Sequence, residues 1–165
     1  MRALVWIVED TWEATIAEAA AFLPSDAEIT LLHVAPADAE GLAAGARHGL
    51  LGRPRHPPPP PHAWPLRAIS EEAAAALLAE ARTRLGRDAT ILSLRGRVER
   101  EVVAAAEDMD LLVLARDGDR AHPGPHSLGP QTRFVADHVP CRVLLVWPDM
   151  SAPTRPADAT LPLRS

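Results

Sequence analysis

Five short apolar runs divide the chain, and segments with helical spacing of their apolar residues separate them. The runs contain few polar residues, which is typical of strands buried on both faces of a sheet. They cover residues 3–8, 29–34, 89–94, 111–114 and 142–146. The helical segments cover residues 11–23, 71–85, 98–106 and 130–138. Strands that alternate with helices predict an α/β fold with a parallel sheet and right-handed crossovers.

Capping residues predict where the helices begin and end. We expect Asp10 to cap the first helix, with Glu13 three residues later as its reciprocal partner. Ser70 is expected to cap the second helix and Gly86 to end it. Pro130 is expected to open the last helix, because proline is favoured at the first helical position.

Two segments interrupt the alternation. Residues 37–69 include five consecutive prolines, Pro57 to Pro61, which cannot donate to a helix or a sheet and favour a stiff polyproline II spacer. We therefore expect a proline-rich insertion at 37–69. Residues 148–165 are rich in Pro, Ala and Thr and are expected to form a flexible C-terminal tail. We expect a single domain over residues 1–147, which contains this insertion.

Composition predicts a cytoplasmic protein. The single cysteine, Cys141, cannot form an internal disulfide, which fits a reducing compartment. No stretch reaches the roughly 18 apolar residues that a membrane span needs, and the N-terminal run lacks the cleavage site of a signal peptide. The net charge of −5 argues against nucleic acid as a partner. We expect neither a membrane nor a nucleic-acid partner.

The absence of lysine excludes two classes of protein. All 17 basic residues are arginine. A P-loop needs a lysine on the phosphates, and a pyridoxal enzyme needs a lysine for its Schiff base. Both classes are excluded.

Polar residues that follow the predicted strands mark the expected site. Ligands of parallel α/β sheets bind beyond the carboxyl ends of the strands, where the strand order reverses. Glu9, Asp10 and Thr11 follow the first strand, and Val34 ends the second. The polar loop 116–128 and the helix start after it follow the fourth strand. We expect a shared cleft at these ends.

Four segments resemble the universal stress protein family in order and spacing. They contain the strand with its acidic turn, the second strand, a helix followed by a strand, and a last helix followed by a last strand. They read VWIVEDTWEA, LLHV, GRVEREVVAAAEDMDLLVLA and GPQTRFVADHVPCRVLLVWP. The resemblance covers most of residues 2–147 apart from the insertion. It implies a single-domain, Rossmann-like, doubly wound sheet of five parallel strands in the order 3-2-1-4-5.

The resemblance also implies a ligand. Nucleotide-binding members place adenine against the end of the second strand and the phosphates on a glycine-rich loop before the last helix. For this chain, ATP or AMP with magnesium is implied. The implied binding residues are Glu9, Asp10, Thr11, Val34, Ala115, Arg116, Gly118, Gly129, Gln131 and Thr132. The implied function is a dimeric binding or signalling protein in the stress response, with a degenerate adenine-nucleotide site.

The phosphate loop departs from the family pattern, in which Gly-x-x-Gly precedes nine residues and then Gly-Ser or Gly-Thr. Arg116 and Asp119 stand where the two glycines belong, and Gly118 replaces one only with a shift of one residue. Pro130 replaces the first hydroxyl residue and removes a backbone N–H, whereas Thr132 matches the second hydroxyl. A phosphate cradle needs converging N–H groups and close approach, so these changes weaken it.

The charges of this loop point both ways. Asp117 and Asp119 would repel a triphosphate, and four cationic or titratable side chains could offset that repulsion. These are Arg116, Arg120, His122 and His126. The prolines between the two histidines prevent a helical metal pair, so we expect no metal site here. A degenerate site and an ATP-binding protein with slow ATPase activity both remain open.

Several candidates also have a purely structural interpretation. Glu9, which stands where the family usually has Asp, and Asp10 could contact a ribose, or could form a helix cap and a solvated carboxylate. Thr132 could contact phosphate or complete the first turn of its helix. Arg116 could contact an anion or remain a solvated charge.

The fifth strand is the expected dimer contact, as in other members of the family. Residues 142–147, from Arg142 to Trp147, are apolar enough to need cover, because bare edge strands invite pairing. We expect a homodimer through this strand.

The sequence gives weaker support to two further classes of protein. The acidic pair after the first strand resembles a phosphoacceptor receiver domain, but Ala115 stands at the phosphorylated position and the required lysine is missing. An enzyme of the wider adenine-nucleotide hydrolase group would need a nucleophile, a base or a metal cluster, and none is evident. We therefore expect no efficient enzymatic turnover.

Overall fold

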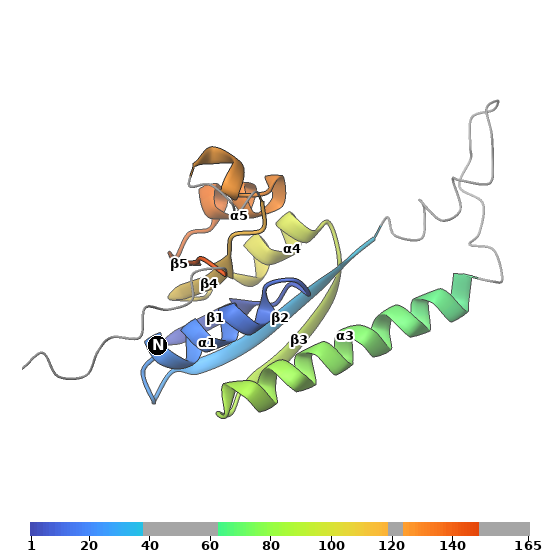
Figure 1. Cartoon of the computed structure of the whole chain (residues 1–165), viewed down its shortest axis with the longest axis horizontal. Helices are drawn as coiled ribbons and strands as arrows, with labels where there is room; N and C mark the ends of the chain where they lie inside the picture. The colour runs from blue at the N-terminus through green and yellow to red at the C-terminus, as the bar shows by residue number, and fades with distance from the viewer. Residues whose placement is uncertain (38–62, 119–123, 149–165) are drawn as a thin grey trace, which may run out of the picture.

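The computed structural model describes residues 1–37, 63–118 and 124–148 of the chain. Strands and helices alternate along these residues (Figure 1). The strands are β1 (Arg2–Trp6), β2 (Glu28–Pro36), β3 (Thr90–Gly96), β4 (Leu111–Ala115) and β5 (Arg142–Val146). The helices are α1 (Trp12–Phe22), α3 (Ala63–Leu85), α4 (Val98–Ala105) and α5 (Pro130–His138), with the 3-10 helix η1 (Pro125–Ser127) before α5.

The five strands form one sheet in the order β3-β2-β1-β4-β5, and every pair is parallel. The central strand β1 pairs with β2 on one side and with β4 on the other, so that Val5 lies opposite both Leu31 and Val113. The predicted α/β fold, its doubly wound parallel sheet and the strand order 3-2-1-4-5 are therefore confirmed.

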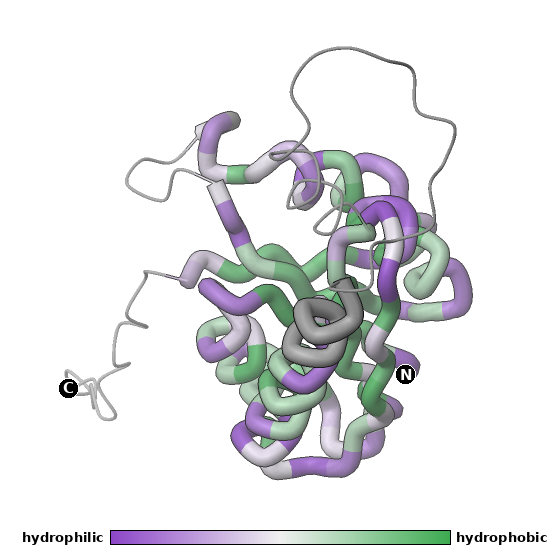
Figure 2. The backbone as a smooth tube through the Cα atoms, turned by 90° about the vertical axis from the view of Figure 1, so that its right-hand side faces the viewer, coloured by the Kyte–Doolittle hydropathy of each residue, from purple (hydrophilic) through white to green (hydrophobic). Residues whose placement is uncertain are grey.

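Helices cover both faces of this sheet (Figure 1). On one face, Ile16 of α1 and Leu78 of α3 belong to a buried apolar cluster with residues of the strands. On the other face, Val102 of α4 and Val135 of α5 belong to a second cluster. Figure 2 shows the apolar strands running through the interior and the polar segments around them. Two separate cores thus hold the three layers together.

The strand β1 and the residue after it show why the runs are apolar at every position. Ala3, Val5 and Ile7 belong to the first cluster, whereas Leu4 and Trp6 belong to the second. Successive side chains of a strand point to opposite faces, and both faces are covered here. A continuous apolar run is the result.

Two predicted caps are wrong. The N-cap of α1 is Thr11 rather than Asp10, and no side chain caps it. Helix α3 begins at Ala63, so Ser70 lies inside the helix instead of capping it. Pro65 lies in the first turn of α3, where its missing N–H costs no helical hydrogen bond, so it does not stop the helix.

The strands β2 and β3 extend further toward their carboxyl ends than predicted. Pro36 pairs with Gly96, and the Ala37 N–H donates to the Gly96 carbonyl at 3.1 Å. The predicted insertion therefore has ordered ends, in Ala37 and in α3. Its remaining part, residues 38–62, lies outside the described residues, as does most of the predicted tail at 149–165.

Candidate functional site

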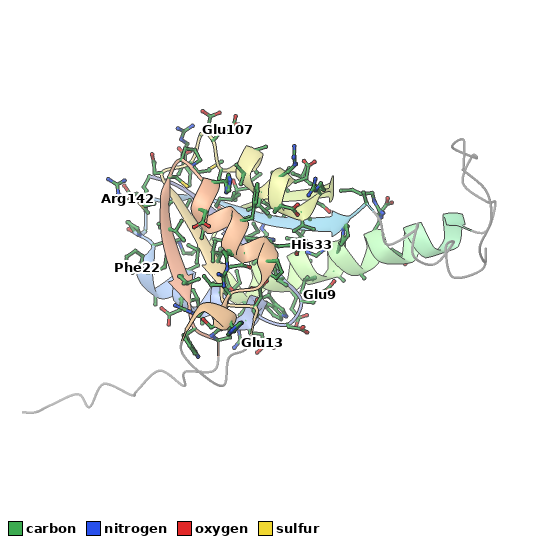
Figure 3. All side chains as sticks on the ribbon, turned by 90° about the horizontal axis from the view of Figure 1, so that it is seen from above. Glu9, Glu13, Phe22, His33, Glu107 and Arg142 are labelled. Atoms are coloured by element: carbon green, nitrogen blue, oxygen red, sulfur yellow. The ribbon has the colours of Figure 1, made fainter. Side chains whose placement is uncertain are left out.

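Three strand ends meet at one edge of the sheet. Because β1 lies between β2 and β4 and the three strands are parallel, their carboxyl ends are neighbours, and the strand order reverses at this point. We call this edge the carboxyl rim. It comprises residues 8–11, 33–36, 115–118 and 127–132. Figure 3 shows Glu9 and His33 on this side of the molecule, whereas Glu107 and Arg142 lie toward the opposite end.

The turn after β1 presents two carboxylates. The Val8 carbonyl accepts hydrogen bonds from the Thr11 N–H at 3.0 Å and from the Trp12 N–H at 2.9 Å, which fixes the turn. Thr11 is buried, whereas Glu9 and Asp10 are exposed. Within the described part of the chain, neither carboxylate makes an ion pair. Both are therefore available at the rim.

The end of β2 places a buried histidine beside this turn. The His33 Nδ1 lies 3.1 Å from the Ile7 carbonyl oxygen, and because a carbonyl can only accept, Nδ1 carries the proton. The His33 side chain is buried, as is Val34, which follows it on the opposite face. Sequence reasoning missed His33. The available signal was a titratable residue within a run whose other residues, apart from Thr30, are apolar.

The residue after β4, Arg116, makes contacts within the protein. Ala115 is buried, and the Arg116 N–H donates to the Val146 carbonyl at 2.9 Å. The Arg116 guanidinium donates to the Ser127 hydroxyl and lies over the Trp147 ring, 4.6 Å from its centroid. Such a cation–π contact, together with a charge-assisted hydrogen bond, fixes the side chain against β5 and the loop.

The loop before α5 closes on its own backbone. The Gly118 N–H donates to the Ser127 carbonyl at 3.0 Å, and the fully buried Ser127 hydroxyl donates to the Gly124 carbonyl at 2.7 Å. A Cβ atom at Gly118 would overlap the carbonyl oxygen of His126, so no larger residue fits there without movement. Gly118 therefore serves the packing of the loop.

The start of α5 carries a carboxylate from the same loop. The Gly129 N–H donates to the Asp117 Oδ1 atom at 2.7 Å. The first hydrogen bond inside the helix runs from the Arg133 N–H to the Gly129 carbonyl at 2.9 Å. Thr132 is 1% exposed, whereas Gln131 is exposed. Thr132 thus lies beneath the start of the helix and Gln131 on its surface.

The predicted site residues thus fall into two groups on one rim. Those after β1 and near the end of β2 are Glu9, Asp10, Thr11 and Val34. Those at the end of β4, in the loop after it and at the start of α5 are Ala115, Arg116, Gly118, Gly129, Gln131 and Thr132. Asp119 and His122 lie outside the described residues. The partners of the second group, Asp117 and Ser127, were not predicted, because their contacts depend on how the loop folds.

The single cysteine lies away from this rim. Cys141 precedes β5, is half-buried, and packs against the second apolar cluster. Burial raises the pKa of its thiol. A thiol of this kind is mostly protonated at neutral pH and is a poor nucleophile.

The chain belongs to the universal stress protein family, whose family model matches residues 8–146. The match therefore assigns the α/β fold of this chain to a known family of proteins. None of the curated proteins matches the chain.

Solved structures share the fold at low identity. UspA from Lactobacillus plantarum is 20% identical, with a TM-score of 0.56 over 88% of this chain and 97% of that one. A universal stress protein in complex with cAMP is 18% identical, with a TM-score of 0.56 over 90% and 97%. An Arabidopsis thaliana family member with AMP bound is 16% identical, with a TM-score of 0.58 over 96% and 99%. At these identities the likeness shows the fold alone.

The described residues contain neither a cluster of metal ligands nor a helix that could span a membrane. Among them, no three His, Cys, Asp or Glu side chains gather closely enough to hold a metal ion. No helix in the same part of the chain has the length and apolar character to cross a membrane.

Proposed function

We propose that this universal stress protein family member binds an adenine nucleotide at the carboxyl rim and acts as a cytoplasmic binding or signalling protein in the stress response. The observation that carries the proposal is the convergence of the β1, β2 and β4 ends where the strand order reverses. The family members solved with cAMP and with AMP have the same fold, which supports an adenine ligand.

The half of the rim after β1 and β2 suits the nucleoside. The exposed Glu9 carboxylate can accept hydrogen bonds from ribose hydroxyls or from the adenine amino group. Val34, two residues before the end of β2, is buried, so the apolar contact for the base comes from the exposed Pro36. A planar apolar ligand with a few hydroxyl donors matches this combination.

Calorimetric titration of the full chain with adenosine, AMP and cAMP tests this proposal, with GMP as the control for base recognition. We expect binding of the adenine ligands at roughly micromolar dissociation constants and weaker binding of GMP. Absence of both heat and thermal stabilisation at millimolar concentrations of every adenine ligand would contradict the proposal.

We further propose a homodimer through β5 and Trp147. β5 is paired on one side only, by β4. Arg142 and Val143 are exposed, and the Val143 side chain is 37% exposed although it is apolar. An edge strand with exposed apolar residues is a template for pairing with another chain. Pairing of two β5 strands would cover it.

Light scattering at micromolar concentration tests the dimer. We expect Val143→Asp to convert a dimer into a monomer, because the carboxylate would lose its water in the interface. Ile91→Asp is the matched control, since Ile91 is 42% exposed on the other edge strand, β3, and this variant should stay dimeric. A monomeric wild type, or a dimeric Val143→Asp variant, would contradict the proposal.

A further inference from the structure

The N-terminus of α5 is already in contact with a negatively charged side chain of the same protein. The Asp117 Oδ1 atom accepts the Gly129 N–H at 2.7 Å. A Cβ atom at Gly129 would lie 2.8 Å from Oδ2 and 2.9 Å from Oδ1 of Asp117, so both carboxylate oxygens lie close to the N-terminus of the helix. Free N–H groups and the helix dipole favour negative charge at this position. A carboxylate therefore lies where a ligand phosphate would be stabilised.

Other donors that a phosphate chain would need are also used or missing. The Gly118 N–H donates to the Ser127 carbonyl. Pro130, the first residue of α5, has no N–H. At the start of this helix, only the amides of Gln131 and Thr132 remain without a partner inside the helix. Together with the Gly129 N–H, which is bonded to Asp117, three N–H groups are thus used or missing, and a carboxylate lies beside them.

The nearest arginine does not compensate for this charge. The Arg116 guanidinium donates to the Ser127 hydroxyl and stacks on Trp147. Recruiting it to a phosphate would break both contacts. The first two residues after β4 thus place a carboxylate, and no unpaired cation, at the start of α5.

We propose that Asp117 determines the ligand specificity of the rim by acting as an internal substitute for phosphate. It selects adenosine and adenosine monophosphates over the di- and triphosphates. The inference rests on the proposed adenine-nucleotide function, because it concerns the same rim. Asp117 is exposed, and like charges at close range disfavour binding there too, with each added phosphate adding negative charge.

Calorimetry with adenosine, AMP and ATP tests the proposal on the full chain and three variants. Asp117→Ala removes the hydrogen bond and the charge, whereas Asp117→Asn removes the charge but keeps an acceptor for the Gly129 N–H. Asp110→Ala is the matched control, because Asp110 Oδ2 accepts the Arg2 N–H at the same 2.7 Å at the opposite edge of the sheet.

We expect wild type to bind AMP more tightly than ATP. Asp117→Ala should raise the affinity for ATP relative to adenosine by about tenfold, the size of a favourable charge interaction at a helix start. Asp117→Asn should shift the ratio less in the same direction, and Asp110→Ala should leave it unchanged. If Asp117→Ala does not fold, the shift in Asp117→Asn decides the question.

Two results would overturn the inference while the proposed function stands: equal affinities of wild type for ATP and adenosine, or an unchanged ratio in the Asp117 variants. If neither wild type nor variants bind any adenine ligand, the proposed function fails. Titration with inorganic tripolyphosphate, followed through the Gly129 amide by NMR, then decides about Asp117. The amide should respond in Asp117→Ala and not in wild type, and the absence of this response would overturn the inference.

Discussion

The two halves of the carboxyl rim differ in how far their polar groups are paired within the chain. After β1, the exposed carboxylates of Glu9 and Asp10 make no ion pair among the described residues. After β4, Asp117 and Arg116 are both engaged, the first with Gly129 and the second with Ser127 and Trp147. Both halves are polar in sequence, yet among the described residues the carboxylates after β1 are unpaired, whereas Asp117 and Arg116 are not.

This difference teaches that residue type at a rim does not by itself define a binding group. A donor or acceptor that is satisfied inside the protein must give up that partner before it can bind a ligand, and the loss offsets the gain. In the proposed function, the paired half after β4 therefore discriminates among ligands, whereas the unpaired half after β1 binds them. Four changes would test this division, and they follow from the largest expected effect to the smallest.

Glu9→Ala should weaken the binding of adenosine by about 10- to 100-fold, because a hydrogen bond to a charged group contributes roughly 1.5–3 kcal/mol. The unfolding free energy should change little, since the side chain is exposed. Glu13→Ala is the control, with an exposed carboxylate in the first turn of α1. Calorimetry measures the affinity of both variants for adenosine, and equal affinities would contradict a role of Glu9 in binding.

Arg116→Met should lower the unfolding free energy by about 1–3 kcal/mol, because the Ser127 hydroxyl oxygen loses its charged donor and the Trp147 face loses its cation. For a domain of this size the midpoint of thermal unfolding should fall by roughly 2–4 °C per kcal/mol. Arg100→Met, at an exposed position of α4, should stay close to wild type. If stability is kept and only ATP binding falls, Arg116 belongs to the binding half instead.

Gly129→Ala should displace the Asp117 carboxylate, because the new Cβ atom would lie 2.8 Å from its Oδ2. The backbone φ of −64° at this position accepts alanine without strain, so the cost is about 1 kcal/mol, from the weakened hydrogen bond and a poorer cap. Chemical denaturation measures it. In Asp117→Ala the same substitution should cost less, and an equal cost in both backgrounds would show that the contact does not carry the effect.

Asp110→Asn should have the smallest effect, and it should depend on pH. The N–H of Arg2 donates to the Asp110 carboxylate and holds its pKa below the ordinary value of 3.8. A lowered pKa in the folded state stabilises the fold above pH 3.8, and this contribution is lost as the pH falls through the folded-state pKa. Wild type and variant should therefore differ slightly in thermal stability at pH 6 and converge as the pH falls through the folded-state pKa of Asp110. A difference of constant size down to the most acidic pH at which the protein folds would assign the effect to shape rather than to charge.

Much of the fold could be predicted, because burial leaves a periodic pattern. The strand at 142–146 was predicted with the bounds that β5 has in the structure. The start of α3 was not, because prolines were interpreted as breaking a helix that in fact begins at Ala63 with Pro65 in its first turn. Proline is tolerated there because the first N–H groups of a helix have no intrahelical partner.

The site could be predicted in its position but not in its pairing. The parallel order of strands follows from alternation with helices, so residues after the first, second and fourth strands were expected at one edge. His33 was missed because one polar residue in a buried run gives no indication of its partner, the Ile7 carbonyl. Arg116 was weighed as an anion contact or a solvated charge, and the structure instead places it on Trp147.

The amino-acid sequence by itself determined the alternation of strands and helices, the class of fold and the edge at which a ligand would bind. These features depend on the local spacing of apolar residues, which every segment carries within itself. Only the tertiary structure decided which polar groups at that edge are already satisfied. The Asp117 carboxylate reaches a backbone N–H 12 residues away at Gly129, and the Arg116 guanidinium reaches the ring of Trp147, which follows another strand. Such partners are chosen by the way the chain packs, because a hydrogen bond depends on distance and direction in space rather than on spacing along the chain.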